Sequence, residues 1–198
     1  MQDALIVIDM QNDFCPGGAL AVAEGDKIVA GINARMAEIG VVVLTQDWHP
    51  ADHLSFASQH PGRAPMEHVQ MPYGTQVLWP DHCVQASPGS DFHPDLDTRR
   101  ADMIVRKGFN REIDSYSAFF ENDQRTPTGL DGYLRSRGLQ RLEFVGLATD
   151  FCVAWSALDA AKLGFDVSVR IELCRGIDLD GSLAAAFERM RTAGVRLV

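Results

Sequence analysis

Three side chains that could carry out nucleophilic chemistry each follow a short apolar run in the sequence. Asp9 comes directly after one run, Lys107 lies two residues beyond another, and Cys152 lies seven residues beyond a third. A cysteine thiolate can attack a carbonyl carbon, and a nearby carboxylate can take the thiol proton and later activate water. Lys107 could pair with Asp9 and favour the thiolate. Taken singly, each has a structural interpretation: a buried cysteine, a carboxylate that fixes a loop, and a solvated lysine.

Cys152 has the most favourable setting of the four cysteines. We expect a helix from Phe151 to Leu163 with Asp150 as its N-cap, which places Cys152 in the first turn. The unpaired N–H groups and the dipole at a helix start stabilise a thiolate and could hold the oxyanion of a tetrahedral adduct. The remaining cysteines form no CxxC pair and no disulfide-like spacing, so we interpret them as buried free thiols: Cys15, Cys83 and Cys174.

A second group of residues has the chemistry of a metal site. Asp47 and His49 are separated by one residue, so they point the same way from an extended backbone. With a third ligand they would form a site of two histidines and one carboxylate with open positions, which suits Fe(II), Mn(II) or Zn(II). His53 and His82 both follow, and spacing alone does not choose between them. The structural alternative is a set of histidines scattered in a polar loop.

The elements that would bring these side chains together are short apolar runs alternating with helical patterns. The runs are Ala4–Ile8, Val41–Leu44, Met103–Val105, Leu142–Val145, Val167–Ile171 and Val195–Val198. The helical patterns between them end at Gly40, Gly138, Gly164 and Gly194, where glycine can take the left-handed conformation that closes a helix. This alternation predicts a doubly wound α/β fold with six parallel strands and helices on both faces. Its carboxyl edge would hold Asp9, Asp47, Lys107 and Cys152.

Composition limits the classes of partner. The 198 residues suit a single domain, 1–198, and the net charge of −9 without a basic stripe argues against nucleic acid. No segment approaches the roughly 20 apolar residues of a membrane span, and the first residues show no secretion signal. We therefore expect a cytoplasmic protein that binds a small molecule and no membrane. The sequence is also compatible with a homo-oligomer.

One region interrupts the alternation of runs and helical patterns. Residues 48–100 hold seven of the nine prolines and all six histidines. A loop of this length inside a compact domain is usually functional or disordered, and its aromatic residues argue against disorder. We interpret the region at about 47–100 as a metal-binding loop.

The motifs in these places resemble those of nicotinamidases, which are isochorismatase-like cysteine hydrolases. The matching segments follow one another along nearly the whole chain: 9–14 with 15–20, 45–50 with 53–56, 78–83, 107–108 with 114–119, and 146–153. The resemblance implies the isochorismatase-like hydrolase fold, a six-stranded parallel sheet with helices on both faces.

The resemblance also implies roles for individual residues. Asp9, Lys107 and Cys152 correspond to the catalytic triad, and the backbone N–H groups of Ala148 and Cys152 to the oxyanion hole. Asp47, His49 and His82 correspond to the metal ligands, while His53 is a ligand in some relatives only. The substrate pocket would be formed by Phe14, Trp79, Tyr116 and Leu147, with the pyridine nitrogen on the metal. In the family the Leu147–Ala148 peptide is typically cis.

We therefore predict hydrolysis of nicotinamide to nicotinate and ammonia through a cysteine thioester, as a step of NAD salvage, with one divalent metal ion as cofactor. An amidase acting on an N-carbamoyl or ureido compound is the nearest alternative, although such relatives generally lack the Asp47–His49 pair and the later histidine. Isochorismatase itself usually lacks the cysteine. A non-catalytic metal-binding protein on the same fold is a third hypothesis.

Overall fold

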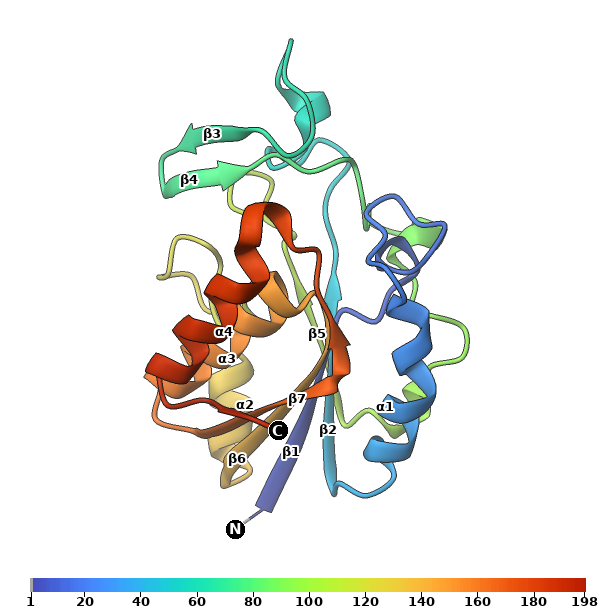
Figure 1. Ribbon diagram of the computed structural model, residues 1–198, viewed down its shortest axis with the longest axis vertical. Helices are drawn as coiled ribbons and strands as arrows, with labels where there is room; N and C mark the ends of the chain where they lie inside the picture. The colour runs from blue at the N-terminus through green and yellow to red at the C-terminus, as the bar shows by residue number, and fades with distance from the viewer. Residues whose placement is uncertain (1) are drawn as a thin grey trace.

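A six-stranded parallel sheet forms the centre of the computed structural model, which describes residues 2–198 (Figure 1). Across the sheet the strands are β5 (Met103–Lys107), β2 (Val41–Asp47), β1 (Gln2–Ile8), β6 (Leu139–Leu147), β7 (Asp166–Arg175) and β8 (Arg196–Leu197). Every neighbouring pair is parallel. The predicted sheet is confirmed, and each strand overlaps one of the six apolar runs.

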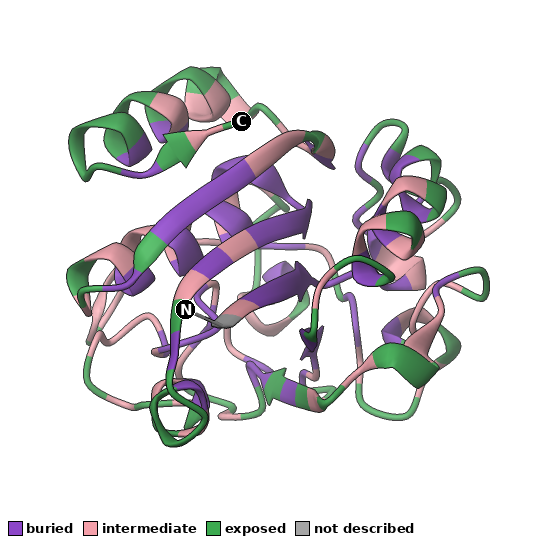
Figure 2. Ribbon diagram, turned by 90° about the horizontal axis from the view of Figure 1, so that it is seen from below, coloured by how far each residue is buried: buried purple, intermediate pink, exposed green. Residues whose placement is uncertain are grey.

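Helices cover both faces of the sheet, as the doubly wound fold requires. Helix α1 (Val29–Met36) lies on one face, and α2 (Leu130–Ser136), α3 (Ala154–Lys162) and α4 (Ser182–Thr192) lie on the other (Figure 1). Alternate residues of β1 enter two separate apolar clusters, one beneath each layer of helices. The central strands are consequently buried along most of their length (Figure 2). Among residues 2–198, no helix combines the length and the apolar character needed to cross a bilayer.

Three of the four glycines predicted to close helices do so. Gly138, Gly164 and Gly194 have φ of 67°, 89° and 81°, the left-handed conformation expected after a helix. Gly40 does not take positive φ, so this part of the prediction is wrong. The reason is that α1 already ends at Met36, and the intervening residues carry the chain to β2 without a left-handed turn.

Glu143 joins helix α1 to strands β6 and β7. Its carboxylate accepts hydrogen bonds from Arg35 Nε at 2.7 Å and Nη2 at 3.0 Å, and from Arg170 Nε at 3.0 Å and Nη2 at 3.2 Å. Burial raises the pKa of Glu143, but the two guanidinium groups outweigh it and hold that pKa below its usual range. This pair of bidentate contacts ties the helix to the sheet face.

The long region after β2 lies beyond the carboxyl ends of the strands. It is ordered by short turns and by an antiparallel hairpin, β3 (His68–Met71) and β4 (Gly74–Val77), which stands apart from the sheet at the top of Figure 1. The sequence did not predict this hairpin, because its side chains are mostly exposed and show no apolar alternation. The region places its own polar residues over the edge where Asp9, Asp47 and Lys107 lie.

Candidate active site

Four of the predicted site residues meet at the carboxyl edge of the sheet. Asp9 follows β1 directly with φ of 47°, while Asp47 and Lys107 are the last residues of β2 and β5. Asp47 and Lys107 are also register partners on neighbouring strands. Cys152 lies five residues beyond the end of β6. The parallel register alone therefore brings a carboxylate and an ammonium group together, and the strand order adds the second carboxylate and the thiol.

Lys107 connects the members of this cluster. Its Nζ lies 2.8 Å from Asp9 Oδ2 and contacts Asp47 Oδ1. The same atom donates to Ser115 O at 2.9 Å and lies 3.5 Å from Cys152 Sγ. The side chain has no exposed area. Burial lowers the pKa of Lys107, but the two carboxylates outweigh burial and hold that pKa well above its usual value, so the group is a fixed cation.

Asp9 is held from the neighbouring strand by Thr45. The Thr45 hydroxyl donates to Asp9 Oδ1 at 2.6 Å and accepts from the Asp9 backbone N–H at 3.1 Å. Burial is the main influence on the carboxyl group and raises the pKa of Asp9, against the opposing effect of Lys107. A carboxylate with a raised pKa and a fixed orientation is suited to accept and return a proton.

The turn that carries Cys152 differs from the expected helix start. Residues Thr149–Val153 form a π-helical turn, in which the Val153 N–H donates to Ala148 O at 3.1 Å, and the α-helix begins only at Ala154. Such widened turns are frequent at functional sites. The Leu147–Ala148 peptide is cis, as the resemblance implied.

Asp150 does not cap the helix, so that prediction is wrong. Its carboxylate turns toward the segment after β7, where it accepts from the N–H groups of Ile177 at 3.0 Å and Asp178 at 2.8 Å and from Ser182 Oγ at 2.5 Å. Three donors from one distant segment satisfy the carboxylate better than a single N–H of its own turn would. Asp150 thus ties the cysteine turn to the start of α4.

Burial is the largest influence on the protonation of Cys152. Burial raises the pKa of the Cys152 thiol well above its usual value, Lys107 lowers it, and the two nearby carboxylates raise it. The stabilisation of a thiolate by the helix start stays a prediction. A carboxylate oxygen of Asp9 lies within 4.8 Å of Cys152 Sγ, so a general base is close to the thiol. The other three cysteines are buried and free.

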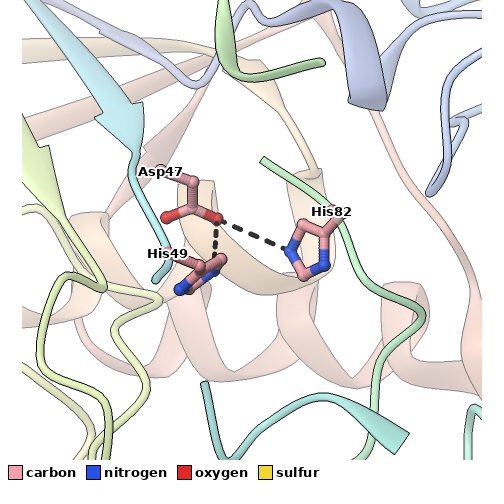
Figure 3. A group of neighbouring side chains, drawn as sticks. All are labelled: Asp47, His49 and His82. Atoms are coloured by element: carbon pink, nitrogen blue, oxygen red, sulfur yellow. Dashed lines mark ion pairs between the residues drawn. The ribbon is translucent and has the colours of Figure 1, made fainter. Parts of the chain in front are cut away.

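Asp47, His49 and His82 form a buried trio with the geometry of a metal site (Figure 3). Asp47 Oδ2 lies 3.6 Å from His49 Nε2 and 3.9 Å from His82 Nε2. His49 Nδ1 contacts Gly108 O at 2.8 Å and His82 Nδ1 contacts Pro80 O at 2.8 Å, which turns both Nε2 lone pairs toward the carboxylate. Ligand atoms around an ion with bonds of about 2.1 Å lie about 3 to 3.5 Å apart. The two separations of 3.6 and 3.9 Å are slightly longer, so the side chains would have to move a few tenths of an ångström inward to bind a divalent cation.

The charge states of Asp47 and His82 agree with this interpretation, whereas without a cation the carboxylate of Asp47 favours the protonated ring of His49. Burial lowers the pKa of His82 to about 4, so its ring is neutral at neutral pH and can bind a cation. Burial also lowers the pKa of His49, but Asp47 outweighs it and raises the pKa. Burial raises the pKa of Asp47, yet Lys107 and the histidines outweigh it and keep the group ionised.

His53 lies beside the trio and faces elsewhere. Its Nδ1 accepts from the Ser55 N–H at 3.1 Å and contacts Ser55 Oγ at 2.7 Å, and its Nε2 lies 3.4 Å from Ile113 O. The rings of His53 and His49 are 4.4 Å apart between centroids. A second set of donors, His49, His53 and Asp114, also lies within 4.8 Å. His53 as a direct ligand stays a prediction.

A narrow, partly open cavity of about 20 Å³, roughly the room of a single water molecule, lies between the cysteine and the trio. Its walls include Phe14, Trp79, Tyr116, Leu20, Phe151 and Ile177, and its polar lining is Asp47, His82, Asp114, Ala148 and Cys152. Trp79 and Phe151 pack edge to face at 4.9 Å between ring centroids. Leu147, predicted as a pocket residue, is fully buried and lies outside this lining. The aromatic side chains in its walls would suit contact with a planar ligand.

Several residues that build the site were missed by sequence reasoning. Gln11 pairs with the Asp47 backbone through two hydrogen bonds of 2.8 Å, and Thr45 holds Asp9. Thr45 could have been found from its place two residues before Asp47, because alternate residues of a strand share a face. Asp114 lines the cavity, and Gln76 contacts it from the hairpin. Gln76 carries no local pattern that points to a site.

Comparisons with known proteins agree on one family. The model of the isochorismatase domain matches residues 3–198. A nicotinamidase of Acinetobacter baylyi is 53% identical over 98% of this chain and 91% of its own length. The solved structure of an Acinetobacter baumanii nicotinamidase/pyrazinamidase has a TM-score of 0.99 at 53% identity and covers 100% of this chain and 95% of that one.

Two further solved structures carry small molecules or metal. A yeast nicotinamidase bound to the inhibitor nicotinaldehyde has a TM-score of 0.92 at 31% identity, over 100% of this chain and 99% of that one. A Pyrococcus horikoshii pyrazinamidase in complex with zinc has a TM-score of 0.80 at 37% identity and covers 100% of this chain and 99% of that one.

Proposed function

Because the chain belongs to the isochorismatase-domain family, we propose that it is an amidohydrolase that converts nicotinamide to nicotinate and ammonia. The observation that carries the proposal is the cavity, which joins Cys152 on one side to the Asp47–His82 pair on the other between aromatic walls. The product is a precursor for NAD, so the reaction belongs to pyridine salvage. In this proposal residues 1–198 form a single catalytic domain, and residues 47–100 supply metal ligands and part of the pocket.

Cys152 is the nucleophile in the proposed mechanism. As Asp9 takes the thiol proton, Sγ attacks the carboxamide carbon, and the N–H groups of Ala148 and Cys152 hold the oxyanion. Asp9 returns the proton to the departing ammonia, which leaves an acyl thioester. Asp9 then takes a proton from water, whose oxygen attacks the thioester carbon; the C–S bond breaks, Asp9 returns the proton to Sγ, and the acid leaves as nicotinate with loss of its proton to solvent. Lys107 stays charged throughout and fixes the carboxylate 2.8 Å away.

Asp47, His49 and His82 are the residues proposed to hold one divalent ion, such as zinc, iron or manganese. The donor set and its spacing support this assignment, and the zinc-bound relative adds to it. When bound, the ion would coordinate the ring nitrogen and draw electron density from the carboxamide. Phe14, Trp79 and Tyr116 would enclose the ring and keep water from it.

Ammonia release from a panel of amides tests the proposed function. The metal-replete protein is expected to hydrolyse nicotinamide well ahead of a ureido compound and an N-carbamoyl amine. Preference for the ureido compound would overturn the substrate assignment, and no release from any amide would favour a metal-binding protein without catalysis.

Two alanine variants distinguish the nucleophilic cysteine from a cysteine that takes no part in catalysis. Cys152→Ala should abolish turnover, while Cys15→Ala should keep most of it, because Cys15 is buried outside the cavity lining. The reverse result would overturn the assignment of the nucleophile.

A further inference from the structure

One side chain of the β3–β4 hairpin is polar and fully buried. Gln76 is 1% exposed, whereas the other residues of the two strands are exposed or half-buried. The hairpin itself lies beyond the carboxyl edge of the sheet (Figure 1). A buried amide is retained only where its donors and acceptor are satisfied, so its partners show what the hairpin is fixed to.

Those partners are two residues of the cavity wall. Gln76 Nε2 donates to Asp114 Oδ2 at 2.7 Å and contacts Tyr116 Oη at 2.9 Å, and the same nitrogen is 2.8 Å from the Val77 carbonyl. Gln76 Oε1 accepts from the Tyr73 hydroxyl and from Asn122 Nδ2, both at 3.2 Å. The opposite orientation of the amide would place an oxygen against the Asp114 carboxylate, so the network determines which atom is the donor.

Tyr116 is held at both of its ends by this network. Its hydroxyl oxygen accepts from Trp79 Nε1 at 3.1 Å and lies 2.9 Å from Gln76 Nε2, whose two N–H groups are shared among three acceptors, and its backbone N–H donates to Asn122 Oδ1 at 3.0 Å. These contacts fix the ring relative to Trp79. Tyr116, Trp79 and Asp114 line the cavity, and Gln76 does not.

We propose that Gln76 is a positioning residue for recognition of the substrate ring. It acts through Tyr116 and Asp114, which it locks against the cavity, and it leaves the cysteine chemistry unaffected. The inference rests on the proposed function, because it names the part of the molecule that sets affinity for a planar aromatic amide. Removing the amide should loosen the wall that faces the ring and spare the groups that attack the carbonyl.

The test compares the same substitution at two positions of the hairpin. Gln76→Leu keeps the size of the side chain and removes all of its hydrogen bonds. The control is Gln70→Leu, the same substitution at an exposed position of the partner strand β3. KM for nicotinamide and the inhibition constant of nicotinate should rise about tenfold in Gln76→Leu, the loss typical of a buried charge-assisted hydrogen bond, with kcat reduced less. Gln70→Leu should match the unaltered protein.

Alkylation of Cys152 by iodoacetamide, followed by mass spectrometry, gives a readout that a structural defect would change. This reagent is a small aliphatic amide and needs the thiol but no aromatic wall, so its rate should be the same in both variants. If kcat and the alkylation rate fall as strongly as KM rises, the residue is merely structural and the proposal is overturned. Equal kinetics for Gln76→Leu and Gln70→Leu would overturn it as well.

A double-mutant cycle identifies the residue through which Gln76 acts. Tyr116→Phe removes the hydroxyl, so adding Gln76→Leu to it should raise KM much less than Gln76→Leu does alone. Additive effects would overturn the proposal. Should Gln76→Leu fail to fold, Gln76→Asn, which withdraws the amide by one methylene, carries the same expectation with a smaller rise in KM. A lack of ammonia release by the unaltered protein would refute the proposed function separately, since this control precedes the comparison.

Discussion

Replacing Lys107 with methionine should strongly destabilise the protein as well as inactivate it. The ammonium group is buried and lies between Asp9 and Asp47. Methionine matches the length of the lysine side chain and fills its space, but it leaves two carboxylates in the interior without a counter-charge. The expected loss therefore reports on electrostatics rather than on a cavity.

The magnitude follows from the contacts. At the 2.8 Å that separate Lys107 Nζ from Asp9 Oδ2, two unit charges attract by about 6 kcal/mol at an effective dielectric constant of about 20. Desolvation of the buried ions offsets much of this attraction, so the pair itself adds little to stability, whereas removal of one partner costs about 3 to 5 kcal/mol. With two carboxylates left unpaired, we expect about 5 kcal/mol, a large share of the 5 to 15 kcal/mol typical of a domain.

Urea unfolding of chelator-treated protein measures the effect, because a bound cation would itself neutralise Asp47. The midpoint of Lys107→Met should lie about 2 M below that of the unaltered protein. Arg106→Met is the matched control, since Arg106 is exposed on the same strand and stacks on Trp48. Adding Asp9→Asn to Lys107→Met should recover part of the loss. If the two methionine variants unfold at the same midpoint, the carboxylates are not ionised partners of Lys107 and the reasoning is refuted.

Three further predictions concern the metal site and the sheet. His49→Ala should lose most bound metal by elemental analysis, while His53→Ala should keep most of it, because its Nε2 faces a backbone carbonyl; equal losses would make His53 a ligand. Gly108→Ala should weaken metal binding at least about tenfold in a chelator competition, since its Cβ would lie 2.4 Å from His49 Cε1. Glu143→Gln should lower the free energy of unfolding by about 1 to 2 kcal/mol at pH 7, as the carboxylate binds two arginines. The pKa of Glu143 is lowered in the folded state, so the difference in stability between the two proteins should be largest above the ordinary glutamate pKa of about 4.3. It should shrink at more acid pH, as the Glu143 carboxylate of the unaltered protein becomes protonated. A difference in stability that does not change with pH would contradict this prediction.

The residues at strand ends could be predicted from the sequence because parallel pairing determines where they lie. Apolar runs identify β1, β2 and β5, and the carboxyl ends of parallel strands share one edge, so Asp9, Asp47 and Lys107 had to be near one another. Their contact follows from register, which pairs Asp47 with Lys107 directly. No knowledge of loop structure is needed for that step.

Features that depend on loops could not be predicted in the same way. The partners of Asp150 come from the segment 177–182, so its role is decided by how that segment returns to the site. The protonation of Cys152 depends on burial, which the sequence around a cysteine does not report. Gln76 reaches Asp114 and Tyr116 across 38 and 40 residues of sequence, through a hairpin with no apolar alternation.

Asp47 couples the two halves of the site because its two carboxylate oxygens face different partners. Oδ1 contacts Lys107, and Oδ2 faces the imidazoles of His49 and His82. A cation bound by the histidines would therefore interact with the same carboxylate charge that attracts the Lys107 ammonium group. Lys107 would then interact relatively more with Asp9 and Cys152, whose proton transfer begins the reaction. In the proposed mechanism, ring recognition and thiol activation are linked through this one side chain. A variant of Asp47 should therefore impair both, in a way that neither a histidine variant nor a Gln76 variant can reproduce.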